Sequence, residues 1–501
     1  MSRPISRLLK SFMLSPLLWI AVLFALIRPV ASAFALPSLT QTDAPTAPTL
    51  PILWTAGGVD AGNTGAGQAA RVATDPAGNV AIVSAPALAT GLAVTSYTPN
   101  GDFRWRGIVT PTSGTFQADW VVAAPNGDVI AVGHNVNANG DPIAMTMVRY
   151  ATDGSQLYRV DLARTLPSVG RLLVDSTGNT YLVFNSLGDG QDIELHKYNA
   201  SGGLIWAQPL ATTLLANDLA TSLALSPDET EILLTGDNSG GAIWIVASYD
   251  TATGTQNWLV TDPEGLAALD VVVDATQVYV TGQGNVGIQT YLTVIAYDRT
   301  TGAKLWRTDT RPDDSTGGLG TRLSLAPDGS LAVAGAALHG FLDWYTVALE
   351  TDGTIRWTAV RDGGLFTDEI PHGMLVLADG TTVVTGRGGP ALPGGFIQGV
   401  TAGYNSNGDL VWEAFSAQET RWPTTLPDGN VCATGGYDAL ITCWDLVGTP
   451  LPTPTPTNPP TSTNTPTPTN TPTLTPTPSP TPTGTPSAPE YKFYLPVLIR
   501  P

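Results

Sequence analysis

The stretch LSLAPDGSLAVAG, residues 323–335, places a Pro327-Asp328-Gly329 turn between two short apolar runs. Proline presets φ at the second position of a tight turn, and glycine accepts positive φ, so the chain reverses direction here. Apolar runs of this length on both sides of such a turn predict a β-hairpin. Working outward from it, similar turns recur about every fifty residues, which is the spacing of a structural repeat.

Two kinds of turn alternate along the chain. The first occurs at Asp75–Asn79, Pro125–Asp128, Asp175–Asn179, Pro227–Glu229, Asp274–Thr276, Pro327–Gly329, Ala378–Gly380 and Pro427–Gly429. The second contains glycine and is followed by an aromatic residue, at Trp105, Tyr158, Trp206, Trp258, Trp306, Trp357 and Trp412. Two hairpins per repeat give four strands, which is the content of one propeller blade.

The two ends of the repeat region predict how the ring closes. An extra strand around Trp54 precedes the first complete repeat, and the last unit, residues 424–446, supplies only three strands. Pairing the Trp54 strand beside the strand of Cys443 completes the last blade and removes open sheet edges. We therefore predict an all-β, eight-bladed β-propeller over residues 50–447. Seven blades, or a solenoid of stacked units, are the alternatives, and a solenoid would need capping repeats.

The repeated aromatic residues have a structural interpretation. One sheet cannot bury both of its faces alone, so a large ring at the same place in every blade fills the gap to the next blade. We expect this packing role for Trp54, Trp105, Tyr158, Trp206, Trp258, Trp306, Trp357 and Trp412.

Residues 296–306, AYDRTTGAKLW, match the pattern A-x-D-x-x-T-G-x-x-x-W. This pattern resembles the repeat of the pyrroloquinoline-quinone-like (quinoprotein-type) propellers. Residues 250–258 are nearly as similar, and the other repeats keep only the glycine and the aromatic residue. The resemblance covers roughly residues 50–447. It implies the propeller fold and the docking of adjacent blades by the repeated tryptophans.

The resemblance also raises the possibility of a quinone-dependent dehydrogenase. Enzymes of the class that this repeat resembles share a vicinal cysteine pair, a calcium site of carboxylate and amide oxygens, and an aspartate base. This sequence has no adjacent cysteines, and we find no such carboxylate set in a recognisable context. We therefore predict no cofactor, no catalytic residue and no resident metal.

Other catalytic and metal-binding patterns give the same result. His134, His196, His339 and His372 lie in four different repeats without short metal-ligand spacing or a Gly-x-Ser-x-Gly elbow, so we expect loop or surface positions for them. Residues 135–141, NVNANGD, resemble the start of a calcium loop, but Asn replaces the usual Asp and the later Glu is absent. A polar hairpin loop is the favoured interpretation.

The two cysteines, Cys432 and Cys443, flank a Gly435–Asp438 turn. Pairing the strands around that turn sets the cysteines opposite or nearly opposite each other. In an exported protein we expect them to form a disulfide.

The N-terminal residues have the pattern of an export signal. Basic residues precede an apolar run from Met13 to Ile27, and small-x-small sites follow at residues 31–35. We predict a cleaved signal peptide over residues 1–33, the general secretory route and no membrane span after cleavage, with an uncleaved anchor as the alternative. Residues 34–49 are predicted to be a disordered leader.

The C-terminal segment differs sharply in composition. Residues 448–489 are almost entirely Pro and Thr, which predicts a semi-rigid stalk, and residues 490–501 form a short apolar segment. The formal net charge of −19 argues against a nucleic-acid partner, because phosphate binding needs clustered Lys and Arg.

These observations lead to two functional hypotheses. The first is an extracellular or cell-surface binding or scaffold module that is not an enzyme, with a protein or glycan partner on one face of the ring. That face would carry the longer connections, around residues 135–141, 185–192, 311–320 and 387–395, since recognition usually lies in variable loops on a rigid scaffold. The second is an exported quinone-type oxidoreductase, with an axial funnel of carboxylates and an aromatic platform.

Overall fold

The computed structural model describes residues 48–446, except 58–67, 86–90, 112, 164–166, 187–192, 211–217, 239–242, 264, 364–367, 392–396, 417 and 436–439. The predicted signal peptide, stalk and C-terminal segment, and all but the end of the leader, lie outside these residues. No helix among the residues described is long and apolar enough to cross a membrane.

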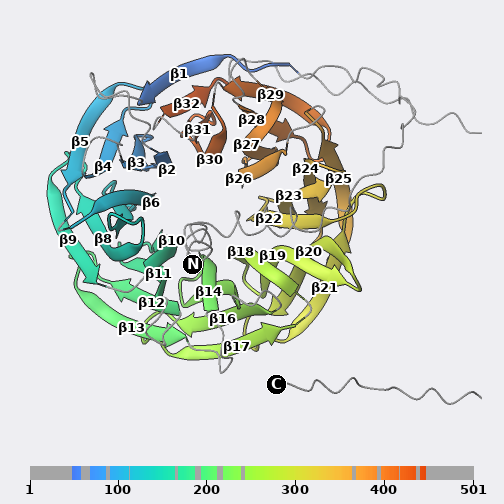
Figure 1. Cartoon of the computed structure of the whole chain (residues 1–501), viewed down its shortest axis with the longest axis horizontal. Helices are drawn as coiled ribbons and strands as arrows, with labels where there is room; N and C mark the ends of the chain where they lie inside the picture. The colour runs from blue at the N-terminus through green and yellow to red at the C-terminus, as the bar shows by residue number, and fades with distance from the viewer. Residues whose placement is uncertain are drawn as a thin grey trace, which may run out of the picture. The chain divides into compact units, whose positions relative to one another are not determined.

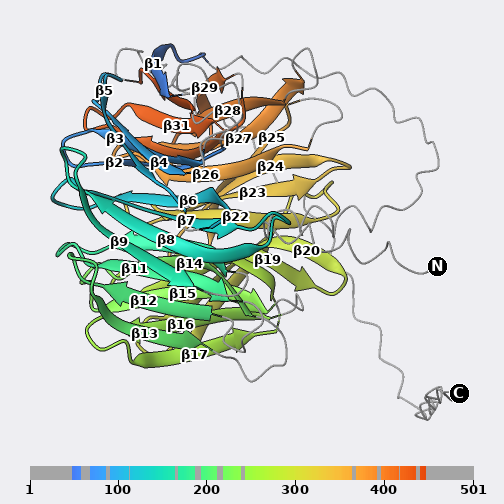
Figure 2. The same cartoon turned by 60° about the vertical axis from the view of Figure 1, so that its left-hand side comes forward.

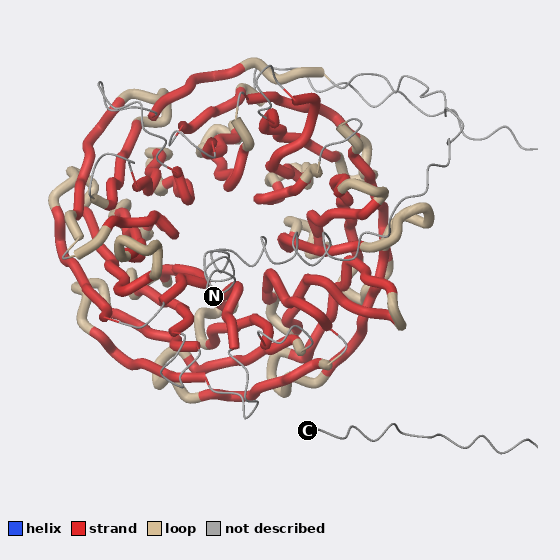
Figure 3. The backbone as a smooth tube through the Cα atoms, viewed as in Figure 1, coloured by secondary structure: helices blue, strands red, loops and turns tan. Residues whose placement is uncertain are grey.

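The described chain forms eight four-stranded antiparallel sheets arranged around an axis, each a blade (Figures 1 and 3). Blades 1 and 2 consist of β2 (Gln68–Thr74), β3 (Val80–Ala85), β4 (Leu92–Tyr97), β5 (Phe103–Val109), β6 (Thr115–Ala123), β7 (Val129–Val136), β8 (Pro142–Tyr150) and β9 (Gln156–Ala163). Blades 3 and 4 consist of β10 (Pro167–Val174), β11 (Thr180–Ser186), β12 (Ile193–Tyr198), β13 (Leu204–Leu210), β14 (Asp218–Leu225), β15 (Glu231–Asn238), β16 (Trp244–Asp250) and β17 (Gln256–Asp262).

The second half of the ring repeats the pattern. Blades 5 and 6 consist of β18 (Gly265–Val273), β19 (Gln277–Val286), β20 (Gln289–Asp298), β21 (Lys304–Thr310), β22 (Gly318–Leu325), β23 (Leu331–Leu338), β24 (Leu342–Leu349) and β25 (Ile355–Arg361). Blades 7 and 8 consist of β26 (Ile370–Val376), β27 (Thr382–Ala391), β28 (Ile397–Tyr404), β29 (Leu410–Ser416), β30 (Thr420–Thr425), β31 (Val431–Gly435), β32 (Leu440–Trp444) and β1 (Ile52–Gly57).

Ring closure follows the sequence prediction. The order in blade 8 is β1-β32-β31-β30, so the first strand of the chain is the outermost strand of the last blade. Trp54 is paired with Cys443, and Cys443 is paired with Cys432 on the other side. The predicted eight-bladed propeller and its mode of closure are both confirmed.

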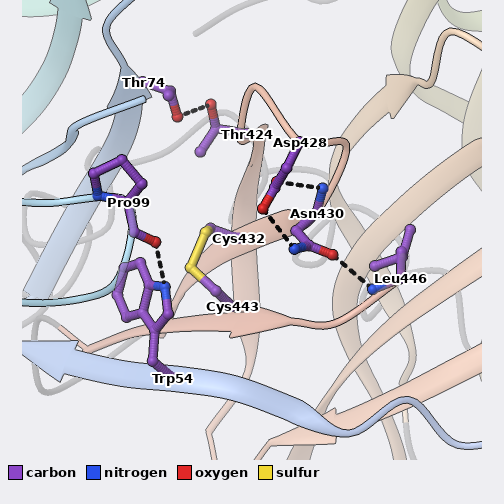
Figure 4. The surroundings of a disulfide bond; sticks show 9 residues. All are labelled: Trp54, Thr74, Pro99, Thr424, Asp428, Asn430, Cys432, Cys443 and Leu446. Atoms are coloured by element: carbon purple, nitrogen blue, oxygen red, sulfur yellow. Dashed lines mark hydrogen bonds between the residues drawn. A yellow bond between two sulfur atoms is a disulfide. The ribbon is translucent and has the colours of Figure 1, made fainter. Parts of the chain in front are cut away.

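The last blade also contains the predicted disulfide, between Cys432 and Cys443 (Figure 4). Both cysteines are fully buried. The glycine-containing turn that the sequence placed between them falls mostly outside the described residues.

Adjacent blades meet where an outer-strand aromatic ring covers a glycine of the next blade. A Cβ built on Gly101 would lie 2.7 Å from the Trp54 ring, and one on Gly302 would lie 2.8 Å from Trp258. The same contact joins Gly154 to Trp105, Gly202 to Tyr158, Gly254 to Trp206, Gly353 to Trp306 and Gly408 to Trp357. These glycines all have positive φ, so the position suits glycine in conformation as well as in size.

Hydrogen bonds reinforce these contacts. The indole N–H of Trp54 donates to the Pro99 carbonyl at 2.8 Å, and that of Trp258 donates to the Arg299 carbonyl at 2.8 Å. Trp105, Trp206 and Trp306 donate in the same way to Thr152, Thr251 and Thr351. These five indoles therefore pack against the next blade and also have their one donor satisfied.

Trp412 is the exception, because no turn connects β32 to β1. The chain segment before β1 lies there instead: Leu50 and Trp444 pack in one buried cluster with Trp412. The Leu50 amide donates to the Glu413 carbonyl at 3.0 Å, and the Glu413 amide donates to Pro48 at 3.1 Å. The end of the leader thus takes the position that a turn occupies in the other blades.

Gly302 allows the aromatic contact to be tested by substitution. Gly302→Ala and Gly329→Ala both place a side chain at positive φ, but only Gly302 faces a ring, since nothing lies within 4 Å of a Cβ at Gly329. We expect Gly329→Ala to lower the free energy of unfolding by about 1 kcal/mol. Gly302→Ala should lower it by about 1–3 kcal/mol more, because the Trp258 ring must shift. Equal losses in denaturant titrations of the two variants would contradict the packing role.

The disulfide gives a second prediction. Because it closes a short loop, the Cys432→Ser/Cys443→Ser double variant should lose about 3 kcal/mol of unfolding free energy in the chain-entropy model. Denaturant titration measures this loss, and thiol labelling of the cell-produced protein, unfolded without a reductant, should modify neither cysteine. Labelling of both would show that the bond does not form in the cell.

Candidate functional site

Each innermost strand carries a β-bulge in its pairing with the next strand. The register shifts between Ala69 and Arg71 in β2 and between Gly320 and Arg322 in β22, and equivalent shifts occur in β6, β10, β14, β18, β26 and β30. A bulge inserts one residue and redirects the side chains beside it. The side chains at these bulges form one cluster, here called the axial cluster: Arg71, Trp120, Arg171, Ser222, Asp270, Arg322, His372 and Trp422, one from each blade.

Contacts within the axial cluster run round the ring. Arg171 Nη1 donates to Ser222 Oγ at 2.6 Å and to Asp270 Oδ1 at 2.8 Å, although blade 4 separates the blades of Arg171 and Asp270. Ser222 Oγ also donates to Asp270 Oδ1, at 2.7 Å. The other Asp270 oxygen accepts the Leu323 amide at 3.1 Å, which continues the chain of contacts into blade 6.

The remaining contacts return to blade 1. Arg322 Nε donates to the His372 carbonyl at 2.9 Å, and its guanidinium lies 4.3 Å from the centroid of the Trp422 ring. The Arg71 guanidinium lies 3.0 Å from Trp422 and 3.6 Å from Trp120, measured to the ring centroids. Arg71 therefore stacks on both rings, an arrangement that suits the flat guanidinium.

Positive charge predominates in the axial cluster. Burial, together with the nearby Arg322, Arg171 and Arg421, holds the pKa of Arg71 well below its usual value, and burial lowers the pKa of Arg322 to about 10. Arg171 pairs with Asp270, and Arg421 pairs with Glu419 at 2.5 Å. Burial alone would raise the pKa of Glu419, but His372 and Arg421 lower it to about 2.

Several buried nitrogen atoms of this region have no hydrogen-bond partner. They are Arg71 Nη1, Arg171 Nε, His134 Nε2 and His372 Nε2. His372 Nε2 lies 3.7 Å from Glu419, which is too far for a hydrogen bond. Buried donors normally have partners, so these atoms mark a site with unused hydrogen-bonding capacity.

A depression of about 690 Å³ lies among the first turns of blades 1, 2, 3, 4 and 8. Its lining includes Thr74 and Val174, each three residues along its strand from an axial arginine, or roughly 10 Å. The hydroxyls of Thr74 and Thr424, both in its lining, share a hydrogen bond of 2.8 Å (Figure 4). Its acidic residues are Asp75, Asp175 and Glu229.

The opposite face of the ring, here called the loop face, carries the second connection of each blade and the blade-to-blade connections (Figure 2). This distribution follows from four antiparallel strands per blade. The loops on this face are shorter than the sequence predicted, because the strands extend into the predicted loop ranges. Asn135, Asn185 and Arg387 belong to strands β7, β11 and β27, and β22 already begins at Gly318. Most of the predicted loops at 185–192 and 387–395 lie outside the described residues or within strands.

One hairpin presents apolar side chains on the loop face. Strands β19 and β20 pair along their full length up to Val286 and Gln289, leaving a two-residue turn in which Gly287 has φ of 65°. Ile288 is fully exposed and Val286 is 51% exposed. Arg311 steadies the stem: its Nη2 donates to Gln289 Oε1 at 2.8 Å, and its guanidinium lies 5.1 Å from the Tyr291 ring centroid.

Comparison with known proteins now becomes informative. Residues 292–420 match the family model described as outer membrane protein assembly factor BamB. Together with eight blades and the motif at residues 296–306, this match decides the type of repeat. Residues 292–420 of this eight-bladed propeller have repeats of the BamB-like, PQQ-like type. In it, the motif residues Asp298 and Thr301 close the turn, since the Asp298 carboxylate accepts the Thr301 amide and hydroxyl at 2.8 and 2.7 Å.

Solved structures resemble this PQQ-like propeller in fold. BamB from Moraxella catarrhalis is 16% identical with a TM-score of 0.51, over 79% of this chain and 100% of that one. Chaetomium thermophilum Sqt1 bound to the N-terminus of ribosomal protein L10 is 13% identical with a TM-score of 0.51, over 77% and 98%. Quinohemoprotein alcohol dehydrogenase ADHIIG from Pseudomonas putida HK5 is 12% identical with a TM-score of 0.50, over 83% and 80%. No curated protein matches the sequence.

The expectation that the four histidines occupy loop or surface positions is wrong for three of them. In this PQQ-like propeller His134, His196 and His372 lie on strands β7, β12 and β26 with little exposed surface. His134 Nδ1 lies 2.8 Å from Asp119, which raises the pKa of His134 although burial alone would lower it. His196 contacts Glu194 and Tyr198, so its burial depends on neighbouring side chains that its own sequence context does not reveal.

The segment resembling a calcium loop forms a polar hairpin loop. Asn137 Oδ1 accepts the Asn139 amide at 2.8 Å and the Asp141 amide at 3.0 Å, so this oxygen closes the turn. Within the described part of the propeller, no group of three or more His, Cys, Asp or Glu residues is placed to hold a metal ion.

Asp237, near the loop face, gives a pH-dependent prediction. Burial and the adjacent Asp218 raise the pKa of Asp237 to about 7. Because the folded-state pKa exceeds the usual value of 3.8, the folded protein binds this proton more tightly, and stability falls as pH rises from about 4 to 7. Asp237→Asn should therefore raise the melting temperature more at about pH 8 than at about pH 5. The exposed Asp313→Asn is the control, and an equal effect of Asp237→Asn at both pH values would contradict the burial argument.

Proposed function

We propose that this propeller is an exported, non-catalytic binding or scaffold module whose partner docks on the loop face. The observation that carries the proposal is the β19–β20 hairpin, because it presents Val286 and Ile288 on a braced stem. An exposed apolar pair on a rigid hairpin is typical of an anchor at a protein interface. A protein partner therefore fits this surface better than a glycan.

Two further observations support the export part of the proposal. A buried disulfide suits an oxidising compartment outside the cytoplasm. The N-terminal sequence has the pattern of a secretory signal, and the Pro/Thr-rich segment would hold the ring away from the cell surface. No cofactor is required by this function.

The alternative is a quinone-dependent oxidoreductase, which the fold-level resemblance to an alcohol dehydrogenase keeps open. That hypothesis expects carboxylates and an aromatic platform on the axis. The axial cluster does contain two tryptophans, but its charged groups are mainly arginines, and the two cysteines of the chain lie on adjacent strands in blade 8. These features favour binding over catalysis.

Site-specific photo-crosslinking tests the proposed face. A photoreactive residue at position 288, in the full chain displayed on the producing cells, should crosslink one discrete protein. The same residue at position 305 is the matched control, because Leu305 is also an exposed apolar residue of blade 5 but lies on the outer strand β21. Ile288→Asp should weaken partner binding about tenfold or more, as expected for an apolar anchor.

Other outcomes would contradict the proposal. Equal crosslinking from positions 288 and 305, or none from either, would show that the hairpin is not the docking site, and binding to a glycan array would replace the protein partner with a glycan. Saturable binding of pyrroloquinoline quinone with Ca²⁺, followed by dye-linked alcohol or sugar oxidation, would establish the oxidoreductase instead.

A further inference from the structure

We propose that the axial cluster binds a small oxyanion, a molecule carrying carboxylate or phosphate oxygens, with Arg71 as its principal ligand. This site goes beyond the proposed function. It lies at the inner strands rather than at the hairpin tip, so either proposal can fail without the other.

The first argument is the balance of charge. The axial cluster and the nearby Arg421 together provide four arginines. The carboxylates around them already have partners: Asp270 pairs with Arg171, Glu419 with Arg421, and Asp119 with His134. Within the described chain, no ion pair reaches Arg71 or Arg322. Two guanidinium groups therefore share the axis without a carboxylate within pairing distance. Confining unpaired charge in this way is costly, and a bound anion would reduce the cost.

The second argument is the geometry of Arg71. The Trp120 and Trp422 rings both lie against its guanidinium, so the N–H groups at its edge remain for a ligand. Nη1 is buried and has no hydrogen-bond partner, and Nε of the nearby Arg171 is in the same condition. Carboxylate and phosphate oxygens match the planar fork of arginine donors.

The third argument is access. The depression among the first turns of the blades lies at the ends of the strands that carry Arg71, Arg171 and Trp422. About a quarter of the Arg171 side chain is exposed. Its acidic residues are engaged locally: Asp75 accepts the Ala77 and Asn79 amides, and Glu229 accepts the Ser176 amide and hydroxyl. A depression of about 690 Å³ has room for a small anion rather than for a polymer.

Without a bound anion, the buried and unpaired charge of Arg71 should lower the free energy of unfolding of the protein. Replacing a buried, unpaired charge with a neutral side chain removes its desolvation cost, so Arg71→Gln should melt at the same temperature as the unmodified protein or higher. A residue whose role was only to hold the ring together would have the opposite effect.

The experiment is calorimetric titration and thermal melting of the full chain with inorganic phosphate and, separately, with citrate, against sodium chloride at matched ionic strength. At least one anion should bind saturably and raise the melting temperature, and comparison of the two distinguishes a phosphate from a carboxylate ligand. Arg71→Gln should weaken binding by about tenfold or more, the loss expected for a charge-assisted hydrogen bond.

Two further variants control the result. Arg356→Gln removes an arginine from the outer strand β25, where it pairs with Asp328 and Glu350, and should leave anion binding unchanged. Arg171→Lys keeps the axial charge but loses the Nε donor, so it should also weaken anion binding and tests the site independently of Arg71→Gln. Absence of saturable binding by either anion, or equal losses in the Arg356 and axial variants, would overturn the proposal.

Discussion

The contact between an outer-strand aromatic ring and a glycine of the next blade is the interaction on which the ring depends. A four-stranded sheet has two faces to cover, and its neighbours supply the apolar surface for both. At seven of the eight junctions the glycine allows the backbone to approach the aromatic ring, and its positive φ turns the chain toward the next outer strand. Repetition of this one contact sets the spacing of the blades, which in turn brings eight inner strands around a common axis.

The sequence predicted the features that repeat. The turns and aromatic residues recur at fixed spacing, so blade number, strand order and the pairing of the Trp54 strand with the Cys443 strand all followed from counting. The position taken by Leu50 was not foreseen, since a leucine that directly follows the leader, before the first repeat, has no periodic context. The last blade has no turn between its two outer strands, because they come from opposite ends of the repeat region. The sequence indicates that this turn is missing, but it does not indicate that Leu50 takes its place.

The axial cluster could not be predicted in the same way, because the eight blades place five different residue types at this position. Arg71, Ser222 and Trp422 share no chemistry, and what unites them is a bulge four or five residues before the first turn. This nearly constant distance from the first turn is the signal that could have located the axial residues in the sequence. The histidines show the converse limit: burial of His196 depends on Glu194 and Tyr198, whose positions become clear only when the strand is paired.

The cross-strand bond in blade 8 also bears on how the protein responds to tension. Any pull on the chain beyond Leu446 is applied first to β32, which would otherwise separate from its neighbours residue by residue. Only Trp444 and the two residues after it can peel away before the force reaches Cys443, whose covalent link passes the load to β31. A ring pulled from its C-terminal side would therefore keep its last strand in the sheet.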